Sequence, residues 1–143
     1  MTLLDAYALV ALVGDEQAAG EVDALLREGG VSMTSINLGE ALDVLGRVHQ
    51  LPAETLETIV GPLCKEAISV IAPGELEAWD AAELRARHHS RRRHELSLAD
   101  CFLLASASTR RESIATADPA VAASARAEGI DVVALPDRQG VRP

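Results

Sequence analysis

TLLDAYALVALV, residues 2–13, is an apolar run that one carboxylate, Asp5, interrupts. The flanks of Asp5 are too short and too apolar for a surface strand, so we predict a buried strand at residues 2–4 and a helix over residues 6–13. Asp5 then lies at the carboxyl end of the strand, where ligands bind in open α/β sheets. A buried carboxylate there needs compensation, and both helix capping and a bound cation provide it.

The composition suits one cytoplasmic domain of 143 residues with an aliphatic core. Hydrophobic residues make up 48% of the chain and aromatic residues 2%, as expected for helices packed on a parallel sheet. The formal charge of -9 disfavours non-specific binding of nucleic acids. The two cysteines have no disulfide or zinc spacing, and no apolar segment is long enough to span a bilayer.

Strand and helix patterns alternate along the rest of the chain. Short apolar runs predict further strands at residues 31–33, 67–71, 113–116 and 131–135. Caps and amphipathic spacing predict helices from Asp15 to Gly29, Ser35 to about His49, Pro52 to about Lys65, Glu75 to about His89, Ser97 to Ala107 and Asp118 to about Glu128. This alternation predicts one α/β domain over residues 1–137, with a parallel sheet of four to five short strands, and an irregular tail at residues 138–143.

Three further carboxylates lie at comparable places, and each has a structural alternative to a functional role. Asp100 lies in the first turn of a helix that is apolar nearly all round, but Ser97-x-x-Asp100 also matches a capping box. Asp118 follows a strand and precedes Pro119, as an N-cap does. Glu40 points away from the leucine stripe of its helix, where a solvated position is the alternative.

The joint pattern of Asp5, Glu40, Asp100 and Asp118 favours a metal site. All four can reach one crevice at the carboxyl edge of the sheet. Two carboxylates about 4 Å apart repel each other by about 4 kcal/mol at an effective dielectric constant of 20. Mg²⁺ or Mn²⁺ relieves this repulsion, prefers oxygen ligands and activates water for attack on a phosphodiester.

The same residues carry a family resemblance along nearly the whole chain. The motifs are Leu-Leu-Asp5, Asn-Leu-Gly-Glu40-Ala-Leu, Leu-Ser-Leu-Ala-Asp100-Cys-Phe-Leu-Leu-Ala-Ser-Ala, Ala-Thr-Ala-Asp118-Pro-Ala and the terminal Ala-Leu-Pro-Asp. Their order and spacing resemble the PIN domain, specifically the VapC toxin ribonucleases of bacterial toxin-antitoxin pairs. The resemblance implies a three-layer α/β/α fold with a central parallel sheet and Mg²⁺- or Mn²⁺-dependent cleavage of RNA. It also implies a homodimer and inhibition by a small VapB-like antitoxin, with Asp5, Glu40, Asp100 and Asp118 as the acidic site.

One residue departs from the family pattern. Many relatives have a small hydroxyl or amide side chain two places after the first aspartate, where this chain has Tyr7. The Tyr7 phenol could replace that polar contact, or the surroundings of Asp5 could differ. Thr116 keeps the hydroxyl expected just before the last aspartate.

Other classes of function stay open on the sequence alone. A receiver-like signalling domain also has an acidic pocket, but it needs a lysine after a late strand, and the single lysine here, Lys65, falls on an early helix. A PIN-like binding module without catalysis is the other alternative. The basic segment Arg85–His94 suits either a phosphate-binding edge or cations at a helix C-terminus. No serine or cysteine nucleophile stands out, and we expect Cys101 to pack in the core.

Overall fold

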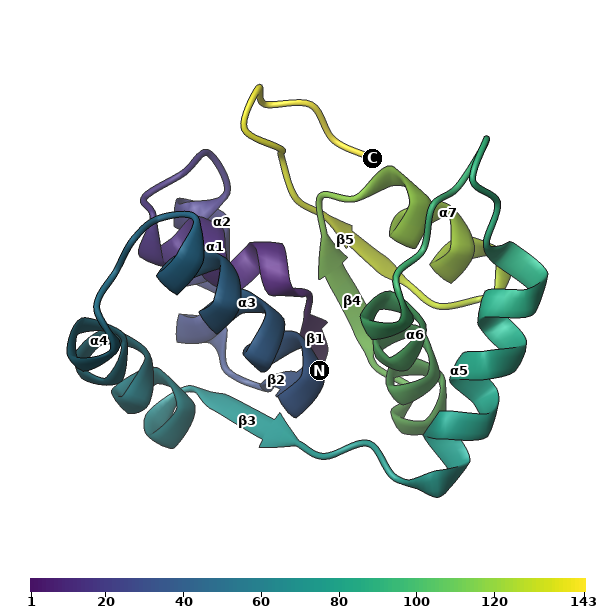
Figure 1. The fold of residues 1–143 in the computed structure, drawn as a ribbon, viewed down its shortest axis with the longest axis horizontal. Helices are drawn as coiled ribbons and strands as arrows, with labels where there is room; N and C mark the ends of the chain where they lie inside the picture. The colour runs from purple at the N-terminus through teal and green to yellow at the C-terminus, as the bar shows by residue number, and fades with distance from the viewer.

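The computed structural model describes residues 1–143 and has a five-stranded parallel sheet at its centre (Figure 1). The strand order is β3-β2-β1-β4-β5, so the first strand lies in the middle. The strands are β1 (Thr2–Leu4), β2 (Val31–Thr34), β3 (Ile68–Ile71), β4 (Ser113–Thr116) and β5 (Val132–Ala134). The predicted parallel sheet is confirmed, and all of its neighbouring strands pair in parallel.

Seven helices cover the two faces of this sheet (Figure 1). Successive residues of β1 point to opposite faces, so Leu4 joins a core with α1–α4 while Leu3 joins a second core with α5–α7. The predicted three-layer α/β/α arrangement is therefore confirmed. The helices are α1 (Ala6–Val13), α2 (Ala19–Glu28), α3 (Ser35–Arg47), α4 (Ala53–Glu66), α5 (Glu75–His88), α6 (Leu98–Arg110) and α7 (Pro119–Ala127).

Two predicted helix starts are wrong. Asp15 does not cap a helix but adopts a left-handed backbone (φ 52°) in the turn after α1, a conformation that aspartate tolerates better than most residues. The second helix begins four residues later, at Ala19, without a side-chain cap. The cap of α3 is Thr34, whose side chain accepts a hydrogen bond from the Asn37 amide, and Ser35 is already the first helical residue.

The buried face of α3 also differs from the leucine stripe that the sequence suggests. Asn37, Ala41 and Leu45 are the buried residues of this helix. Leu38 and Leu42 are only partly buried and line an apolar depression shared with α4. Glu40 directly precedes Ala41 and lies three residues after Asn37. Its side chain therefore lies beside the buried face and reaches the cavity described below.

The C-terminal tail has no regular secondary structure after β5, yet it is fixed by side-chain contacts. Asp137 Oδ1 accepts hydrogen bonds from the backbone amides of Gln139 and Val141, both at 2.8 Å. Elsewhere, Cys101 is fully buried in the core, and both cysteines are unpaired. No helix has the length and apolar character needed to cross a lipid bilayer.

Candidate active site

A cavity of about 640 Å³ opens at the carboxyl edge of the sheet. It lies where β1 and β4 end and where α1, α6 and α7 begin. Its 14 lining residues include every acid predicted from the sequence: Asp5, Glu40, Asp100 and Asp118. The fold thus brings together four carboxylates that are up to 113 positions apart in the chain (118 minus 5).

Asp5 is placed by the junction of β1 and α1. Its backbone amide donates to the Ala115 carbonyl of β4, which continues the sheet ladder by one residue. Its Oδ1 caps α1 by accepting a hydrogen bond from the Ala8 amide at 2.8 Å. The side chain is only 5% exposed, so the helix cap holds a buried carboxylate at the inner end of the cavity.

Asp100 is placed by the capping box that opens α6. Ser97 Oγ accepts a hydrogen bond from the Asp100 amide at 3.0 Å, and Asp100 Oδ2 accepts one from the Ser97 amide at 2.7 Å. The structural alternative considered for this residue is therefore real. It does not remove Asp100 from the cavity, because the same side chain also lines the shared space.

Asp118 is placed by the turn between β4 and α7. Its Oδ1 accepts hydrogen bonds from the Ala120 and Val121 amides at 2.7 and 3.2 Å, with Pro119 at the first helical position. Its own amide donates to the Thr116 hydroxyl at 3.0 Å. Thr116 is fully buried, so the hydroxyl fixes the turn that presents Asp118.

The three aspartates share one geometric feature. Each uses a single carboxylate oxygen to accept hydrogen bonds from backbone amides at the start of a helix. The second oxygen of each side chain, Oδ2 of Asp5, Oδ1 of Asp100 and Oδ2 of Asp118, accepts no hydrogen bond from a backbone amide, although the Thr116 and Ser97 hydroxyls lie close enough to Asp5 and Asp100 to lower their pKa values. Capping and ligand binding are therefore compatible here, because capping orients each carboxylate and leaves one oxygen for another partner.

Glu40 enters the cavity from α3 and is half-buried. Burial raises its pKa, and the charge of Asp100 raises it further, while the Asn37 side chain lowers it. Asn37 was not selected from the sequence, although it lies one helical turn before Glu40. Its Oδ1 accepts a hydrogen bond from the Thr34 hydroxyl at 2.5 Å.

The carboxylates perturb one another electrostatically. Burial raises the pKa of Asp5 to about 7; the Thr116 hydroxyl and the Ala8 amide oppose the rise, and the charges of Asp100 and Asp118 add to it. Burial also raises the pKa of Asp100, and Asp118 contributes in the same direction. Coulombic coupling of this kind requires the groups to be close, which agrees with a shared cavity. A divalent cation would stabilise the ionised form of all of them.

The carboxylates nevertheless do not form a ready-made coordination shell. No group of three or more His, Cys, Asp and Glu side chains in the structure is arranged closely enough to hold a metal ion. The case for a metal rests on the donor set instead: hard oxygen ligands, mutual destabilisation of their charges, and one oxygen on each aspartate that no backbone amide uses.

Cys101 is no nucleophile, although it adjoins Asp100. Burial raises the pKa of the Cys101 thiol to about 11, with a further contribution from the Asp100 charge. A thiol of this kind stays protonated and unreactive at neutral pH. The expectation that Cys101 packs in the core is confirmed by its full burial.

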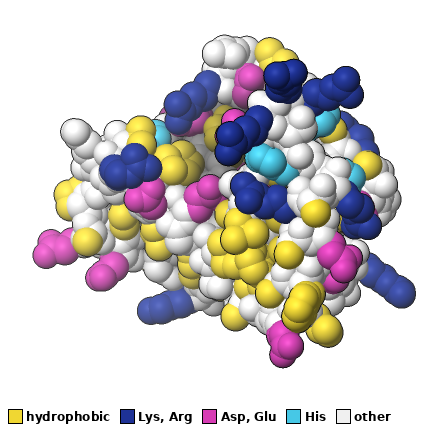
Figure 2. Space-filling view, turned by 45° about the vertical axis from the view of Figure 1, so that its right-hand side comes forward, with side chains coloured by type: hydrophobic (Ala, Val, Ile, Leu, Met, Phe, Trp, Pro, Cys, Tyr) yellow, Lys and Arg dark blue, Asp and Glu magenta, His cyan; other side chains and the backbone are white.

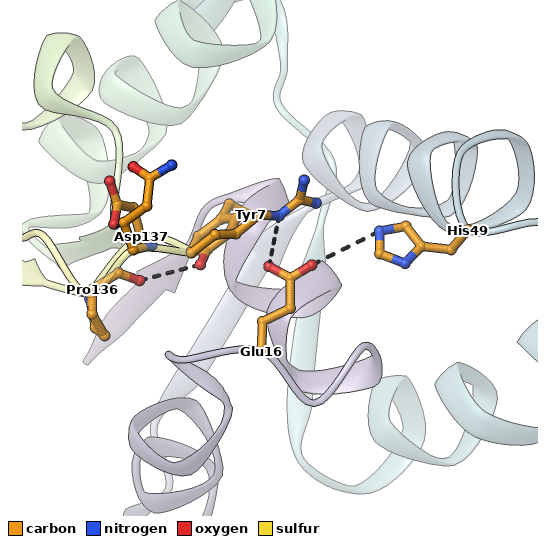
Figure 3. Close-up of polar contacts among 7 residues, drawn as sticks. Tyr7, Glu16, His49, Pro136 and Asp137 are labelled. Atoms are coloured by element: carbon orange, nitrogen blue, oxygen red, sulfur yellow. Dashed lines mark hydrogen bonds and ion pairs between the residues drawn. The ribbon is translucent and has the colours of Figure 1, made fainter.

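Tyr7 does not replace the small polar residue common in relatives. Its hydroxyl donates a hydrogen bond to the Pro136 carbonyl at 3.2 Å, so the ring links α1 to the C-terminal tail (Figure 3). Burial raises the pKa of Tyr7, and the nearby Glu16 carboxylate raises it further. The phenol is therefore a neutral donor to the tail.

Arginine and histidine side chains also line the cavity, and the sequence did not identify them as one group. They are Arg85 and His89 from the end of α5 and Arg138 from the tail. On the face of the molecule drawn in Figure 2, Lys and Arg side chains gather beside acidic ones in the upper part of the view. The first two belong to the basic segment, whereas Arg138 carried no sequence signal.

Comparison with known proteins agrees with this arrangement. The family model of the PIN domain matches residues 2–127. The chain belongs to the PIN domain family. The resemblance inferred from the motifs is thus confirmed at the level of the family, and the 126 matched residues, from 2 to 127, carry all four acids. A comparison with curated protein sequences gives no match.

Solved structures with the same fold include several toxin-antitoxin proteins. VapC20 of Mycobacterium tuberculosis, described as a sarcin-ricin loop cleaving toxin, has a TM-score of 0.71 and 18% identity, with 87% of this chain and 95% of that chain covered. VapBC2 of Rickettsia felis, bound to a promoter DNA fragment, has a TM-score of 0.67 and 13% identity, with coverage of 92% and 96%. FitAcB of Neisseria gonorrhoeae has a TM-score of 0.62 and 21% identity, again covering 92% and 96%.

Proposed function

We propose that this PIN domain protein is a Mg²⁺- or Mn²⁺-dependent endoribonuclease and the toxin of a type II toxin-antitoxin pair. The observation that carries the proposal is the single cavity lined by Asp5, Glu40, Asp100 and Asp118, in which each aspartate keeps one oxygen that no backbone amide uses. Membership of the PIN family and the fold shared with VapC and FitAB proteins support it.

The residues have distinct tasks in this proposal. A divalent ion, when bound, would supply a Lewis acid that activates water and stabilises the charge of the reacting phosphate. Asp5, Asp100 and Asp118 would hold the ion, and their amide hydrogen bonds keep the carboxylates oriented. Glu40 completes the acidic set, either on the metal or through a bound water.

The alternative functions have less support. A receiver domain requires a lysine at the acidic pocket, but Lys65 lies on α4 and lines a different depression, beside Met1 and Val70. A PIN-like module without catalysis would have no need of four carboxylates in one cavity, where burial raises the pKa of Asp5, Glu40 and Asp100. The presence of every acid of the predicted set favours the active enzyme.

Hydrolysis of labelled RNA tests the proposal directly. Wild-type protein should cleave single-stranded RNA with Mn²⁺ or Mg²⁺ and not with a chelator, and Asp100→Asn should lose at least about a hundredfold in rate. Asp43→Asn is the matched control, because Asp43 lies on the exposed side of α3 in an ion pair with Arg47 and does not line the cavity. Cleavage that Asp100→Asn leaves unchanged would refute the nuclease assignment.

An antitoxin and a second copy of the chain are the proposed protein partners. The relatives VapBC2 of Rickettsia felis and a toxin-antitoxin complex of Klebsiella pneumoniae are named as complexes. Here α3 and α4 form an apolar depression of about 340 Å³, and Leu76 and Trp79 of α5 are 74% and 68% exposed. Co-purification with the product of a neighbouring small gene tests the first partner, and light scattering of the isolated chain tests the homodimer.

A further inference from the structure

Two arginines line the acidic cavity and come from segments distant in sequence. Arg85 lies near the end of α5, and Arg138 lies in the C-terminal tail. Both side chains are largely exposed to solvent. Since the cavity holds four carboxylates and the chain has a net charge of -9, a polyanion that enters it needs cations placed at its rim.

Arg138 is held by a nearly buried carboxylate. Its Nε donates a hydrogen bond to Glu16 Oε2 at 3.1 Å. The Glu16 side chain is 14% exposed, whereas the Arg138 side chain is 60% exposed. His49 Nε2 lies 3.9 Å from the other oxygen of Glu16, and Figure 3 shows the carboxylate between these two contacts. Glu16 therefore fixes Nε of Arg138. The two terminal amino groups of Arg138 make no hydrogen bond in the protein.

The tail that carries Arg138 is fastened on both sides of it. Before Arg138, the Tyr7 hydroxyl donates to the Pro136 carbonyl at 3.2 Å. After it, Arg142 pairs with Glu21 of α2 at 2.6 Å. Arg138 is thus an exposed arginine on a segment without regular structure whose position is nevertheless defined, as a binding side chain requires.

Arg85 is held in the same manner. Its Nε donates to the Leu96 carbonyl at 3.3 Å, and the side chain forms no ion pair. A guanidinium anchored through Nε keeps its terminal amino groups in a plane and available for two parallel hydrogen bonds to a phosphate. Arg85 and Arg138 are therefore both held through Nε, and both keep terminal amino groups that can donate hydrogen bonds.

Arg138 also lines a second depression, of about 400 Å³, beside the acidic cavity. Asp118 and Tyr7 line both spaces together with Arg138, so the two spaces adjoin at these residues. Arg85 lies four residues before the loop, residues 89–97, that carries the exposed Arg91, Arg92 and Arg93. An extended single strand would pass from this loop over the acids to the second depression.

We propose that Arg85 and Arg138 bind the RNA phosphates that flank the cleaved one, and that Glu16 is the positioning residue for Arg138. The inference rests on the proposed nuclease function, because that function supplies RNA as the substrate. The RNA strand would then lie between Arg85 and Arg138, and the C-terminal tail would take part in substrate binding. Four carboxylates near the reacting phosphate repel a polyanionic substrate. Arg85 and Arg138 offset this repulsion because they bind the neighbouring phosphates.

Binding of a fluorescent single-stranded RNA, measured by anisotropy in the Asp100→Asn background with Mg²⁺, tests this inference without cleavage. Asparagine keeps an oxygen that can accept the Ser97 amide, so α6 stays capped. Arg138→Gln and Arg85→Gln should each raise Kd by about tenfold. Each should also lower the slope of log Kd against the logarithm of the salt concentration by about 0.7. Arg27→Gln, an equal charge change at an ion pair on α2, should leave Kd nearly unchanged.

Glu16→Gln separates positioning from net charge. The substitution makes the protein more positive, which by itself would strengthen RNA binding. We expect weaker binding, by about threefold or more, because Arg138 loses the carboxylate that fixes it. Asp23→Asn, which changes the charge equally at the ion pair with Arg27, should not weaken binding.

The outcomes distinguish this inference from the proposed function. Binding that Arg138→Gln and Arg27→Gln affect equally overturns the inference, as does tighter binding by Glu16→Gln. RNA cleavage by the wild-type chain can still occur in that case. Conversely, the expected binding pattern with no cleavage by the wild type sustains the RNA path and refutes the nuclease assignment.

Discussion

Replacing Asp5 by asparagine should stabilise the metal-free protein at alkaline pH. Burial is the largest cause of the raised pKa of Asp5, about 7 against an ordinary value of 3.8, so the folded state disfavours the ionised form. Asparagine has nearly the same shape, keeps an oxygen for the Ala8 amide and carries no charge. The variant therefore removes the charge and preserves the cap.

The sign and size follow from proton linkage. Between pH 3.8 and about 7 the folded state binds more protons at Asp5 than the unfolded state, so the free energy of unfolding falls as the pH rises through this window. A difference of about three pH units at about 1.36 kcal/mol per unit amounts to about 4 kcal/mol. Wild type should lose up to about this much from Asp5 by about pH 8, and the variant should lose none of it.

Urea denaturation with a chelator, repeated from about pH 4 to pH 8, measures the effect. The gain of Asp5→Asn over wild type should grow through the window and level off above about pH 7. Asp43→Asn is the control, because Asp43 is exposed and its ion pair with Arg47 lowers its pKa. Parallel pH profiles for wild type and Asp5→Asn would show that Asp5 is not a buried, destabilised charge.

Three further perturbations test other parts of the site. Millimolar Mg²⁺ or Mn²⁺ should raise the melting temperature of wild type, because a cation bound to the folded state stabilises it, and an unchanged melting curve counts against a shared metal site. Ser97→Ala should cost about 1 kcal/mol in unfolding free energy and lower RNA cleavage, since Asp100 loses half of its capping box; full activity would separate the cap from the site. Tyr7→Phe should cost about 1 kcal/mol by urea denaturation through loss of the hydrogen bond to Pro136, and no change would mean that the tail is held without it.

The sequence predicted the sheet and the acids because both depend on local patterns. Short apolar runs marked the strands, including the central β1, and proline or serine marked the starts of α4, α6 and α7. The carboxylates Asp5, Asp100 and Asp118 follow from the same signals, since each occupies a capping position at a helix start. The three aspartates that we propose to be functional are thus the same residues that the capping patterns mark, so one sequence pattern indicated both roles.

The contact between Glu16 and Arg138 could not be predicted in the same way, whereas Arg85 lies in the basic segment that the sequence marks. Glu16 and Arg138 are 122 residues apart, and only the folded tail brings them together. The start of α2 was predicted wrongly at Asp15, because Asp caps many helices. Here Asp15 adopts a left-handed backbone conformation in the turn after α1, directly before Glu16. Arg138 has no neighbouring motif, so its role depends on tertiary structure alone.

Anomalous diffraction from a crystal soaked in Mn²⁺ tests the central claim most directly. The account predicts a manganese peak inside the cavity, among the carboxylate oxygens of Asp5, Asp100 and Asp118 that accept no hydrogen bond from a backbone amide. Absence of a peak there at saturating Mn²⁺, with the three aspartates still bonded to their local amides, would contradict it.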